Sequence, residues 1–211
     1  MNAGGIIGTD FAERTADGVT RMLAVNLLGH VVLLEELLAA DKLTNVAIFS
    51  SSETARGVKK PGLKPPSLHS YCVDEFAYVC DGSFFKVDVN FMASYQYVKF
   101  MGALYMGAMS RKHPGLRLLT VSPGSTMGTD IYDNAPRMTR IMLKVVTSLP
   151  IKSLRERNFH GVDAGAKRYV DALNDDAYLS GRFYASKGQG VTGPMVDPVS
   201  YTHLRAHETA S

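Results

Sequence analysis

Hydrophobic and polar positions alternate along the chain with the periods of helices and strands. Between residues 19 and 38 apolar side chains recur at steps of three and four, which predicts one face of a helix. Helices are also predicted over 94–109 and 163–173, with a moderately apolar helical segment over 131–149. Short apolar runs predict strands at 46–49, 116–121 and 182–185, and the first of them has the continuous apolar character of a strand buried on both faces. A chain of 211 residues with this pattern fits one α/β domain.

The first predicted helix contains the longest apolar region of the chain, residues 22–40. Thr15 or Asp17 can cap its start. Asn26 and His30 interrupt the apolar run, together with two glutamates, so we expect a buried amphipathic helix and no membrane span. Asparagine is unfavourable in a helix interior. Asn26 is therefore either a hydrogen-bonded polar residue of the core or a functional residue.

Two of the predicted strands end in turns that are rich in hydroxyl groups. The first strand is followed by serines at 50–52, and the second by the segment 122–129, which contains Pro123 and Gly124. In open parallel sheets, ligands bind outside the carboxyl ends of the strands. These turns are therefore candidate ligand contacts, although a serine cluster after a strand can equally cap a helix or form a turn.

Two stretches lack any period. In residues 56–90 prolines, glycines and aromatics alternate irregularly, which indicates a long loop. Such a loop is a functional lid, a disordered insertion or a packed surface excursion. From residue 199 the pattern stops, and the last residues resemble the read-through translation of sequencing-adapter DNA. We therefore expect one domain over 1–198 and an artefactual or disordered tail over 199–211.

Composition and charge exclude several classes of function. Hydrophobic residues make up 45% and charged residues 20% of the chain. The net charge of +3 comes from scattered basic residues, so neither a nucleic-acid face nor a patch for anionic membranes is indicated. Cys72 and Cys80 lie eight residues apart, which matches no zinc spacing and no secreted disulfide scaffold. We expect reduced thiols, no metal site and a cytoplasmic location, and no segment has the features of a signal peptide.

Tyr95 and Lys99 are the strongest candidates for chemistry. On a helix, residues four positions apart lie on one face, so both side chains can reach one small ligand. The reference pKa of tyrosine is about 10, and lowering it to about 7 takes roughly 4 kcal/mol of preferential stabilisation of the phenolate. A nearby ammonium favours the phenolate, which makes the pair suitable for acid catalysis. The spacing also occurs by chance in a chain with 10 tyrosines, so its weight depends on the other motifs.

These motifs follow one another in a fixed order: Asn2-Ala3-Gly4, Asn26 inside a helix, serines that close a strand, Tyr95-x-x-x-Lys99 opening a helix, and Pro123-Gly124 with Thr129. Over residues 2–198 they resemble the pattern of the short-chain dehydrogenase/reductase family. The segment 17–30 is similar to the retinol-dehydrogenase-like and protochlorophyllide-reductase-like subgroup. The resemblance implies a Rossmann-like, doubly wound parallel sheet and an oxidoreductase that interconverts an alcohol and a carbonyl with NAD or NADP.

The resemblance also implies a role for each catalytic residue. Tyr95 would exchange a proton with the substrate oxygen, and Lys99 would hold the cofactor ribose and favour the tyrosinate. A serine would hydrogen-bond the carbonyl, with Ser52 preferred over Ser51 by a small margin. Asn26 would hold a water that links Lys99 to solvent. Residues implied to contact the cofactor are Asn2, Ala3, Gly4, Tyr95, Lys99, Pro123, Gly124 and Thr129, and the redox chemistry belongs to the cofactor.

The chain departs from the family pattern in two respects. Ser52 and Tyr95 are 43 residues apart, much farther than is usual in the family, so residues 56–90 are an insertion. The glycine-rich turn that binds the pyrophosphate in this fold is absent. We therefore expect an incomplete sheet without its first βαβ portion, in a truncated fragment that is inactive alone. The choice between NAD and NADP would lie in the missing portion.

The resemblance further implies a homodimer or tetramer, in which the helix after Lys99 and the Asn26 helix pair across an interface. Small residues at 102–103 and 107–108 suit close packing of that helix against another element. Two other readings remain open. One is a non-catalytic dinucleotide sensor or interaction module, and the other is an extended-class epimerase or dehydratase. The sequence does not identify the small-molecule substrate, whose contacts are expected from 56–90 and 131–160.

Overall fold

The computed structural model describes residues 1–6, 13–59, 62–85, 91–128, 137, 141 and 158–197. In chain order its elements are α1 (Arg21–Leu23), the π-helical turn η1 (Ala24–Leu28), α2 (Gly29–Ala39), β1 (Val46–Ser50), the 3₁₀ turn η2 (Glu53–Arg56), α3 (Val73–Asp81), α4 (Phe91–Lys112), β2 (Arg117–Val121), α7 (Val162–Asn174), β3 (Phe183–Ser186), the 3₁₀ turn η4 (Lys187–Gln189) and β4 (Met195–Val196).

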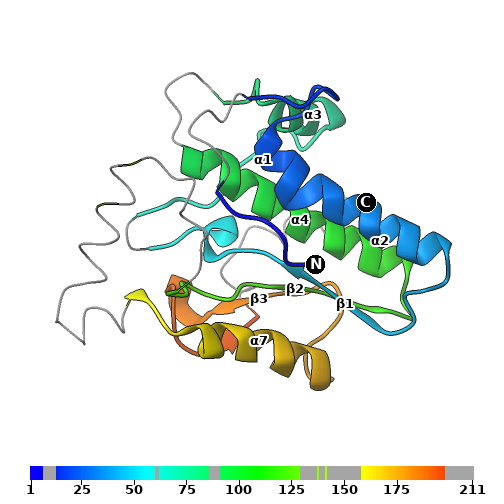
Figure 1. Ribbon diagram of the computed structural model, residues 1–211, viewed down its shortest axis with the longest axis vertical. Helices are drawn as coiled ribbons and strands as arrows, with labels where there is room; N and C mark the ends of the chain where they lie inside the picture. Colours follow the sequence, from blue (N-terminus) through cyan, green and yellow to red (C-terminus); the bar gives the residue numbers. More distant parts are fainter. Residues whose placement is uncertain are drawn as a thin grey trace.

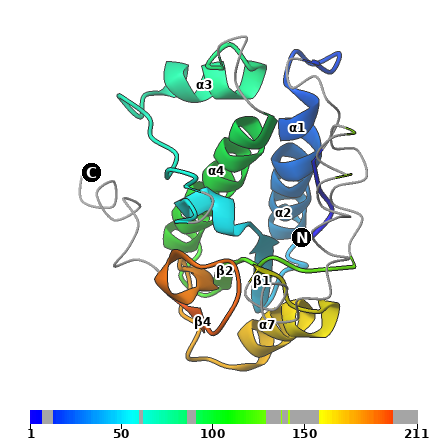
Figure 2. The same cartoon turned by 90° about the vertical axis from the view of Figure 1, so that its left-hand side faces the viewer.

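The described elements form three layers. Figure 1 shows α1, α2 and α4 on one face of the sheet and α7 on the other, with α3 beyond the first helical layer. The view turned by 90° shows the same separation of α7 from α2 and α4 (Figure 2). Helices on both faces of a sheet are typical of a doubly wound α/β fold.

The strands are mainly parallel. β1 pairs with β2 and β2 with β3 in parallel, whereas the short β4 adds antiparallel to β3. Beyond β1, the amino group of Met1 donates to Ile48 O at 3.0 Å, and the Met1 carbonyl accepts from Ser50 N at 3.0 Å. The predicted α/β class with a doubly wound parallel sheet is confirmed, and its three predicted strands lie within a residue or two of their expected positions.

The first predicted helix is a continuous run of α1, η1 and α2. Its start was predicted wrongly, because Thr20 is the cap: its hydroxyl accepts from Leu23 N at 3.2 Å. The inner face packs into the core through Met22, Leu27 and Leu34. The outer face is mixed: Glu35 and Glu36 are exposed, and so are the apolar residues Val25, Leu28, Val32 and Leu33.

Residues 21–39 form the one stretch of the described chain that is long and apolar enough for a membrane-span candidate. This criterion rests on length and composition alone, and core helices meet it too. Here the inner face contacts α4 through α1 and η1.

Helix α4 carries Tyr95 and Lys99 through the centre of the fold. Val98, Met106 and Met109 fix it in the core. Gly102 lies against β1, where an added Cβ would stand only 2.2 Å from a carbon of the Phe49 ring. The expected close packing at this glycine therefore occurs within the chain. This packing offsets the low helix propensity of glycine.

The prediction of an irregular loop over 56–90 is wrong in part, because α3 forms inside it. α3 ends at Gly82, whose φ of 84° is left-handed, as is common after a helix. Glu75 in its first turn accepts hydrogen bonds from the backbone N–H groups of His69, Ser70 and Tyr71 at 2.6–2.9 Å. The Glu75 carboxylate thus ties the segment before α3 to the first turn of the helix.

Two predictions fall largely on residues that the structure does not describe. The helical segment expected over 131–149 lies outside the described residues, apart from positions 137 and 141. The tail over 199–211 lies outside them entirely.

Candidate functional site

A cavity of about 540 Å³ opens at the carboxyl ends of β1 and β2. The turn after β1 contributes residues 50–54, and the turn after β2 contributes 123–126. Tyr95 and Lys99 line it from α4, and Tyr169 is among the residues that line it from α7. The position agrees with the rule that ligands of open parallel sheets bind beyond the carboxyl ends of the strands.

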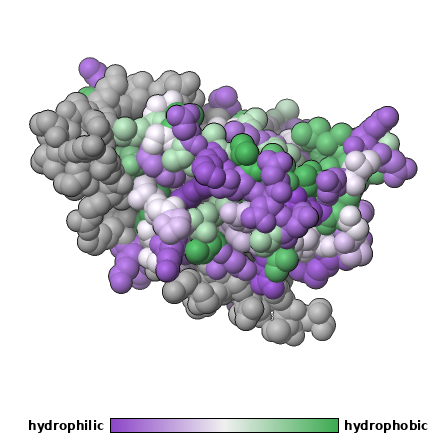
Figure 3. All heavy atoms as spheres, turned by 90° about the horizontal axis from the view of Figure 1, so that it is seen from below, coloured by the Kyte–Doolittle hydropathy of each residue, from purple (hydrophilic) through white to green (hydrophobic). Residues whose placement is uncertain are grey.

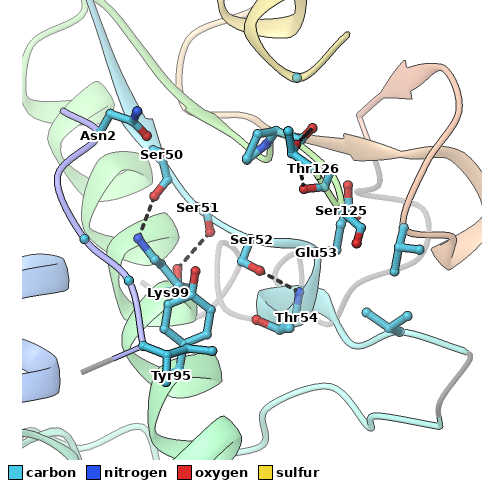
Figure 4. Close-up of a pocket in the computed structure, with 18 of the residues that line it drawn as sticks. Asn2, Ser50, Ser51, Ser52, Glu53, Thr54, Tyr95, Lys99, Ser125 and Thr126 are labelled. Carbon is cyan, nitrogen blue, oxygen red and sulfur yellow. Dashed lines mark hydrogen bonds between the residues drawn. The ribbon is translucent and has the colours of Figure 1, made fainter. Parts of the chain in front are cut away.

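Lys99 is the buried cation of this cavity, with 4% of its surface exposed. Its Nζ donates to the carbonyl oxygen of Ser50 at 2.9 Å, as Figure 4 shows. Burial lowers the pKa of Lys99 to about 8. An ammonium held in this way keeps a fixed position and still has donors for a ligand, because Lys carries three N–H bonds.

Tyr95 lies one helical turn before Lys99, and its side chain is buried at the cavity wall. Lys99 Nζ is 5.6 Å from the centre of the Tyr95 ring and 5.3 Å from that of Phe49. The structure thus brings Tyr95 and Lys99 together, as their spacing predicts. A positive charge at such a distance favours an ionised phenol.

The three serines at the end of β1 point to three different elements. Successive strand residues face opposite sides of a sheet, and accordingly Ser50 Oγ contacts Tyr169 OH on α7 at 2.5 Å, whereas Ser51 Oγ donates to the Lys99 carbonyl on α4 at 3.2 Å. Ser52 Oγ accepts from Thr54 N at 3.3 Å and caps η2. Figure 4 shows Ser51 directed toward α4 and Ser52 toward Thr54. These contacts give no support to the sequence-based preference for Ser52 over Ser51.

Asn26 holds the first residues of the chain. Its Nδ2 donates to Gly5 O at 2.8 Å, and its Oδ1 accepts from Gly5 N at 2.9 Å. It lies in the π-helical turn η1, a feature that is frequent at functional sites. These contacts correspond to the hydrogen-bonded core residue that the sequence left open, and the water-holding role stays a prediction.

The hydrogen bonds between Asn26 and Gly5 bring the Asn2-Ala3-Gly4 segment beside Lys99. Asn2 and Gly4 line the cavity, and the carbonyl of Ala3 accepts from His30 Nε2 at 2.6 Å. A Cβ at Gly4 would lie 2.5 Å from Asn26 Oδ1 and 3.5 Å from Lys99 Nζ. Only glycine permits this close approach, which leaves bare backbone next to the ammonium.

The turn after β2 forms the opposite wall. Pro123 and Gly124 line the cavity, and Gly124 has a left-handed φ of 78°. Thr126 Oγ1 lies 3.2 Å from His160 Nε2, and that nitrogen also donates to the Pro123 carbonyl at 2.7 Å. Thr129, the remaining predicted cofactor contact, lies outside the described residues.

A buried charge network at the cavity wall, centred on Glu53, was not predicted. Glu53 follows the serine turn, and its carboxylate accepts from Arg56 Nε at 2.9 Å, from Arg168 Nη1 at 3.2 Å, and from Ser186 N and Oγ at 2.9 and 2.7 Å. The Glu53-x-x-Arg56 spacing is visible in the sequence. Arg168 on α7 and Ser186 on β3 come next to Glu53 only in the folded chain. Among the described residues, no three His, Cys, Asp or Glu side chains cluster as a metal site would need.

Solved structures that share this fold are found at low sequence identity. A short-chain dehydrogenase family protein from Francisella tularensis is 13% identical with a TM-score of 0.52, and the alignment covers 86% of this chain and 65% of that one. The angucycline C-6 ketoreductase LanV with bound NADP is 18% identical with a TM-score of 0.53, covering 86% and 57%. An uncharacterised protein from Mycobacterium paratuberculosis is 18% identical with a TM-score of 0.56, covering 92% and 55%.

These likenesses show the fold of the chain, a Rossmann-type α/β sheet of the kind found in short-chain dehydrogenases. The chain spans 55–65% of the length of these structures. No protein-family model and no curated protein matches it.

Proposed function

We propose that the protein is a short-chain dehydrogenase/reductase that transfers hydride between a nicotinamide dinucleotide and a small alcohol or carbonyl. One observation carries the proposal: Tyr95 and a buried Lys99 line a single cavity at the carboxyl ends of parallel strands. The bound NADP of one solved neighbour supports the cofactor class. The subgroup similar to retinol dehydrogenases and protochlorophyllide reductases and the cytoplasmic location are part of the proposal, and both rest on the sequence.

In this proposal Tyr95 moves the proton. Its hydroxyl would donate to the substrate oxygen during reduction and take the proton back during oxidation. Lys99 Nζ is anchored by Ser50 O, so its charge stays near the Tyr95 ring throughout. Burial strengthens this interaction, because the local dielectric constant is lower than that of water.

Ser51 is proposed to bind the substrate oxygen. It points to the helix that carries Tyr95, and its hydrogen bond to the Lys99 carbonyl, at 3.2 Å, is long for a hydroxyl donor. Exchanging that weak bond for one to a substrate carbonyl costs little. Ser52 is proposed as the cap of η2 instead.

The described residues fit the nicotinamide end of a dinucleotide. Gly4 lines the cavity next to Lys99 Nζ, and Pro123 and Gly124 line the opposite wall. Lys99 would hold the ribose hydroxyls. Bound there, the nicotinamide would supply or accept the hydride. NAD and NADP both satisfy these contacts.

Hydride transfer by the full-length protein tests the proposal. A panel of ketones and aldehydes with NADH and NADPH, followed by loss of the reduced cofactor, should identify at least one substrate. Ser51→Ala should lower kcat/KM by about 10²-fold or more. Ser52→Ala should mainly remove the hydrogen bond that caps η2, which lowers stability by about 1 kcal/mol. Cofactor binding without turnover would indicate a sensor instead.

A homodimer is part of the proposal. Val25, Leu28, Val32 and Leu33 expose 37–53% of their surface on one side of the α1–α2 helix. On the face that contains α7, hydrophilic and hydrophobic residues are interspersed (Figure 3). Burial of the apolar α1–α2 stripe against a second copy would remove it from water, at a gain of about 25 cal/mol per Å².

A further inference from the structure

The hairpin loop of residues 187–194 joins β3 to the antiparallel β4 and reaches the cavity through Val191. A backbone hydrogen bond of 3.0 Å between its first and last residues closes the loop. Gly188 and Gly193 have left-handed φ values of 67° and 101°, and a Cβ at either position would meet no atom within 4 Å. These two glycines therefore serve the course of the loop and not its packing.

Three backbone carbonyl groups fix this loop on both sides of Val191. Arg56 Nη2 donates to the carbonyl oxygen of the preceding residue at 2.8 Å, and Arg168 Nη2 donates to the carbonyl oxygen two residues after Val191 at 2.8 Å. Ser125 N donates to the carbonyl oxygen of Val191 itself at 2.7 Å. Hydrogen bonds from a guanidinium group are stronger than those from a neutral donor. The loop is thus held at three points, although it contains three glycines.

The two arginines connect the loop to the serine turn after β1. Both donate to the carboxylate of Glu53, which lines the cavity two residues after Ser51. Ser51 is the residue proposed to bind the substrate oxygen. Figure 4 shows Glu53 and Ser125 on the side of the cavity away from Lys99. The loop, which is bonded to Ser125, therefore has a fixed position relative to the substrate serine, away from the lysine proposed to hold the ribose.

Val191 adds an apolar residue of limited size to this part of the lining. Val58 and Met92 line the same cavity from two other segments of the chain. Val58 is buried and is fixed by two reciprocal backbone hydrogen bonds with Leu63, both of 2.8 Å. Valine is branched at Cβ, which restricts its χ1 angle. A wall of fixed, stiff valines discriminates between apolar groups by their size, because it does not yield to a larger one.

We propose that Val191 sets the size of the apolar substituent that the carbonyl substrate carries. This inference rests on the proposed function. With its oxygen held at Ser51 and Tyr95, the substrate directs one substituent toward the 187–194 loop. Val191 limits the space for that substituent, and the bonds from Arg56 and Arg168 prevent the loop from moving away. Val191 is thus a specificity-determining residue, and it takes no part in the proton or hydride transfer.

The test measures kcat/KM of the full-length protein for methyl ketones of increasing size: 2-butanone, 3-methyl-2-butanone, pinacolone and acetophenone. One methylene group in a hydrophobic pocket changes specificity by about 10-fold or more. We therefore expect Val191→Ala to raise the ratio of kcat/KM for acetophenone over 2-butanone by about 10-fold or more, and Val191→Leu to lower it by about 10-fold. Val170→Ala is the matched control and should leave the ratio unchanged, because Val170 is 53% exposed on α7 and is not among the residues that line the cavity.

A binding measurement separates a substrate contact from a cofactor contact. The affinity for nicotinamide mononucleotide, measured by calorimetry, should be the same in the original protein and in both Val191 variants. An altered affinity with an unchanged ketone ratio overturns the inference, because Val191 would then contact the cofactor. The two variants change the ratio in opposite directions, so a general loss of activity through misfolding does not imitate the result.

The outcomes also separate this inference from the proposed function. A ketone ratio that stays within about twofold in both variants overturns the role of Val191 and leaves the proposed function standing. Turnover of other carbonyl compounds, but of no methyl ketone by any of the three proteins, overturns that role as well. If no ketone or aldehyde is turned over with NADH or NADPH, both proposals fall.

Discussion

Replacing Glu53 by Gln perturbs the buried side chain with the most hydrogen bonds among the described residues that line the cavity. The Glu53 side chain is 5% exposed, and those of Arg56 and Arg168 are 0% and 6% exposed. One carboxylate thus faces two guanidinium groups. Arg168 Nη2 also donates to Ser186 Oγ, and Arg56 Nη2 to the Ser186 carbonyl, so η2, α7 and β3 meet at this carboxylate.

The cost of the substitution follows from burial. Removing one partner of a buried ion pair typically costs about 3–5 kcal/mol, because the remaining charge stays uncompensated. Here two guanidinium groups would lose their only carboxylate among the described residues. For a domain of this size, 1 kcal/mol lowers Tm by roughly 2–4 °C, so Glu53→Gln should lower Tm by about 6–20 °C.

Urea denaturation followed by circular dichroism measures this loss. Asp171→Asn is the matched control, because it breaks an exposed pair in which Lys167 Nζ donates to Asp171 Oδ1 at 2.6 Å. That variant should stay within about 0.5 kcal/mol of the original protein. A double-mutant cycle of Glu53→Gln with Arg168→Met should give a coupling above about 1 kcal/mol. A Glu53→Gln protein within 1 kcal/mol of the original would refute the reasoning.

Three other outcomes are expected. Burial lowers the pKa of Lys99 to about 8 in the folded protein. Between about pH 8 and 10 the unfolded chain therefore binds more protons, and the free energy of unfolding rises with pH by about 2–3 kcal/mol. Lys99→Met should abolish this rise in urea titrations, and equal pH slopes for the two proteins would contradict the prediction. Gly102→Ala should destabilise the protein by about 1–3 kcal/mol, since the added Cβ would meet Phe49 at 2.2 Å. Gly107→Ala should be neutral or stabilising by up to about 1 kcal/mol, because a Cβ there would have no neighbour nearer than 3.8 Å. Melting temperatures in the reverse order would show a different packing of α4. Val32→Asp should convert the proposed dimer to a monomer in sedimentation experiments, and a monomeric original protein would refute the dimer.

The sequence predicted what depends on local periodicity. The apolar run before Ser50 places β1, and the four-residue spacing of Tyr95 and Lys99 puts both side chains on one face of α4. Both patterns are direct consequences of strand and helix geometry. The carboxyl-end rule for parallel sheets then brings the β1 turn and α4 to one cavity, as the structure shows.

Contacts between distant segments were beyond such reasoning. Ser50 and Tyr169 are 119 residues apart, and Glu53 and Ser186 are 133 apart. Nothing in a single sequence selects these partners. Helix α3 was missed for a different reason. Its apolar residues Phe76 and Val79 pack into one cluster, but the helix is short and lies in a stretch where prolines, glycines and aromatics alternate irregularly.

Hydride transfer by the full-length protein with Tyr95→Phe tests the central claim most directly. The substitution removes only the phenolic hydroxyl from a buried ring. We predict a fall in kcat of about 10²–10⁴-fold with cofactor affinity unchanged, because a positioned acid contributes a rate factor of that size. A variant that keeps more than half of the original kcat would contradict the assignment of Tyr95 as the proton donor.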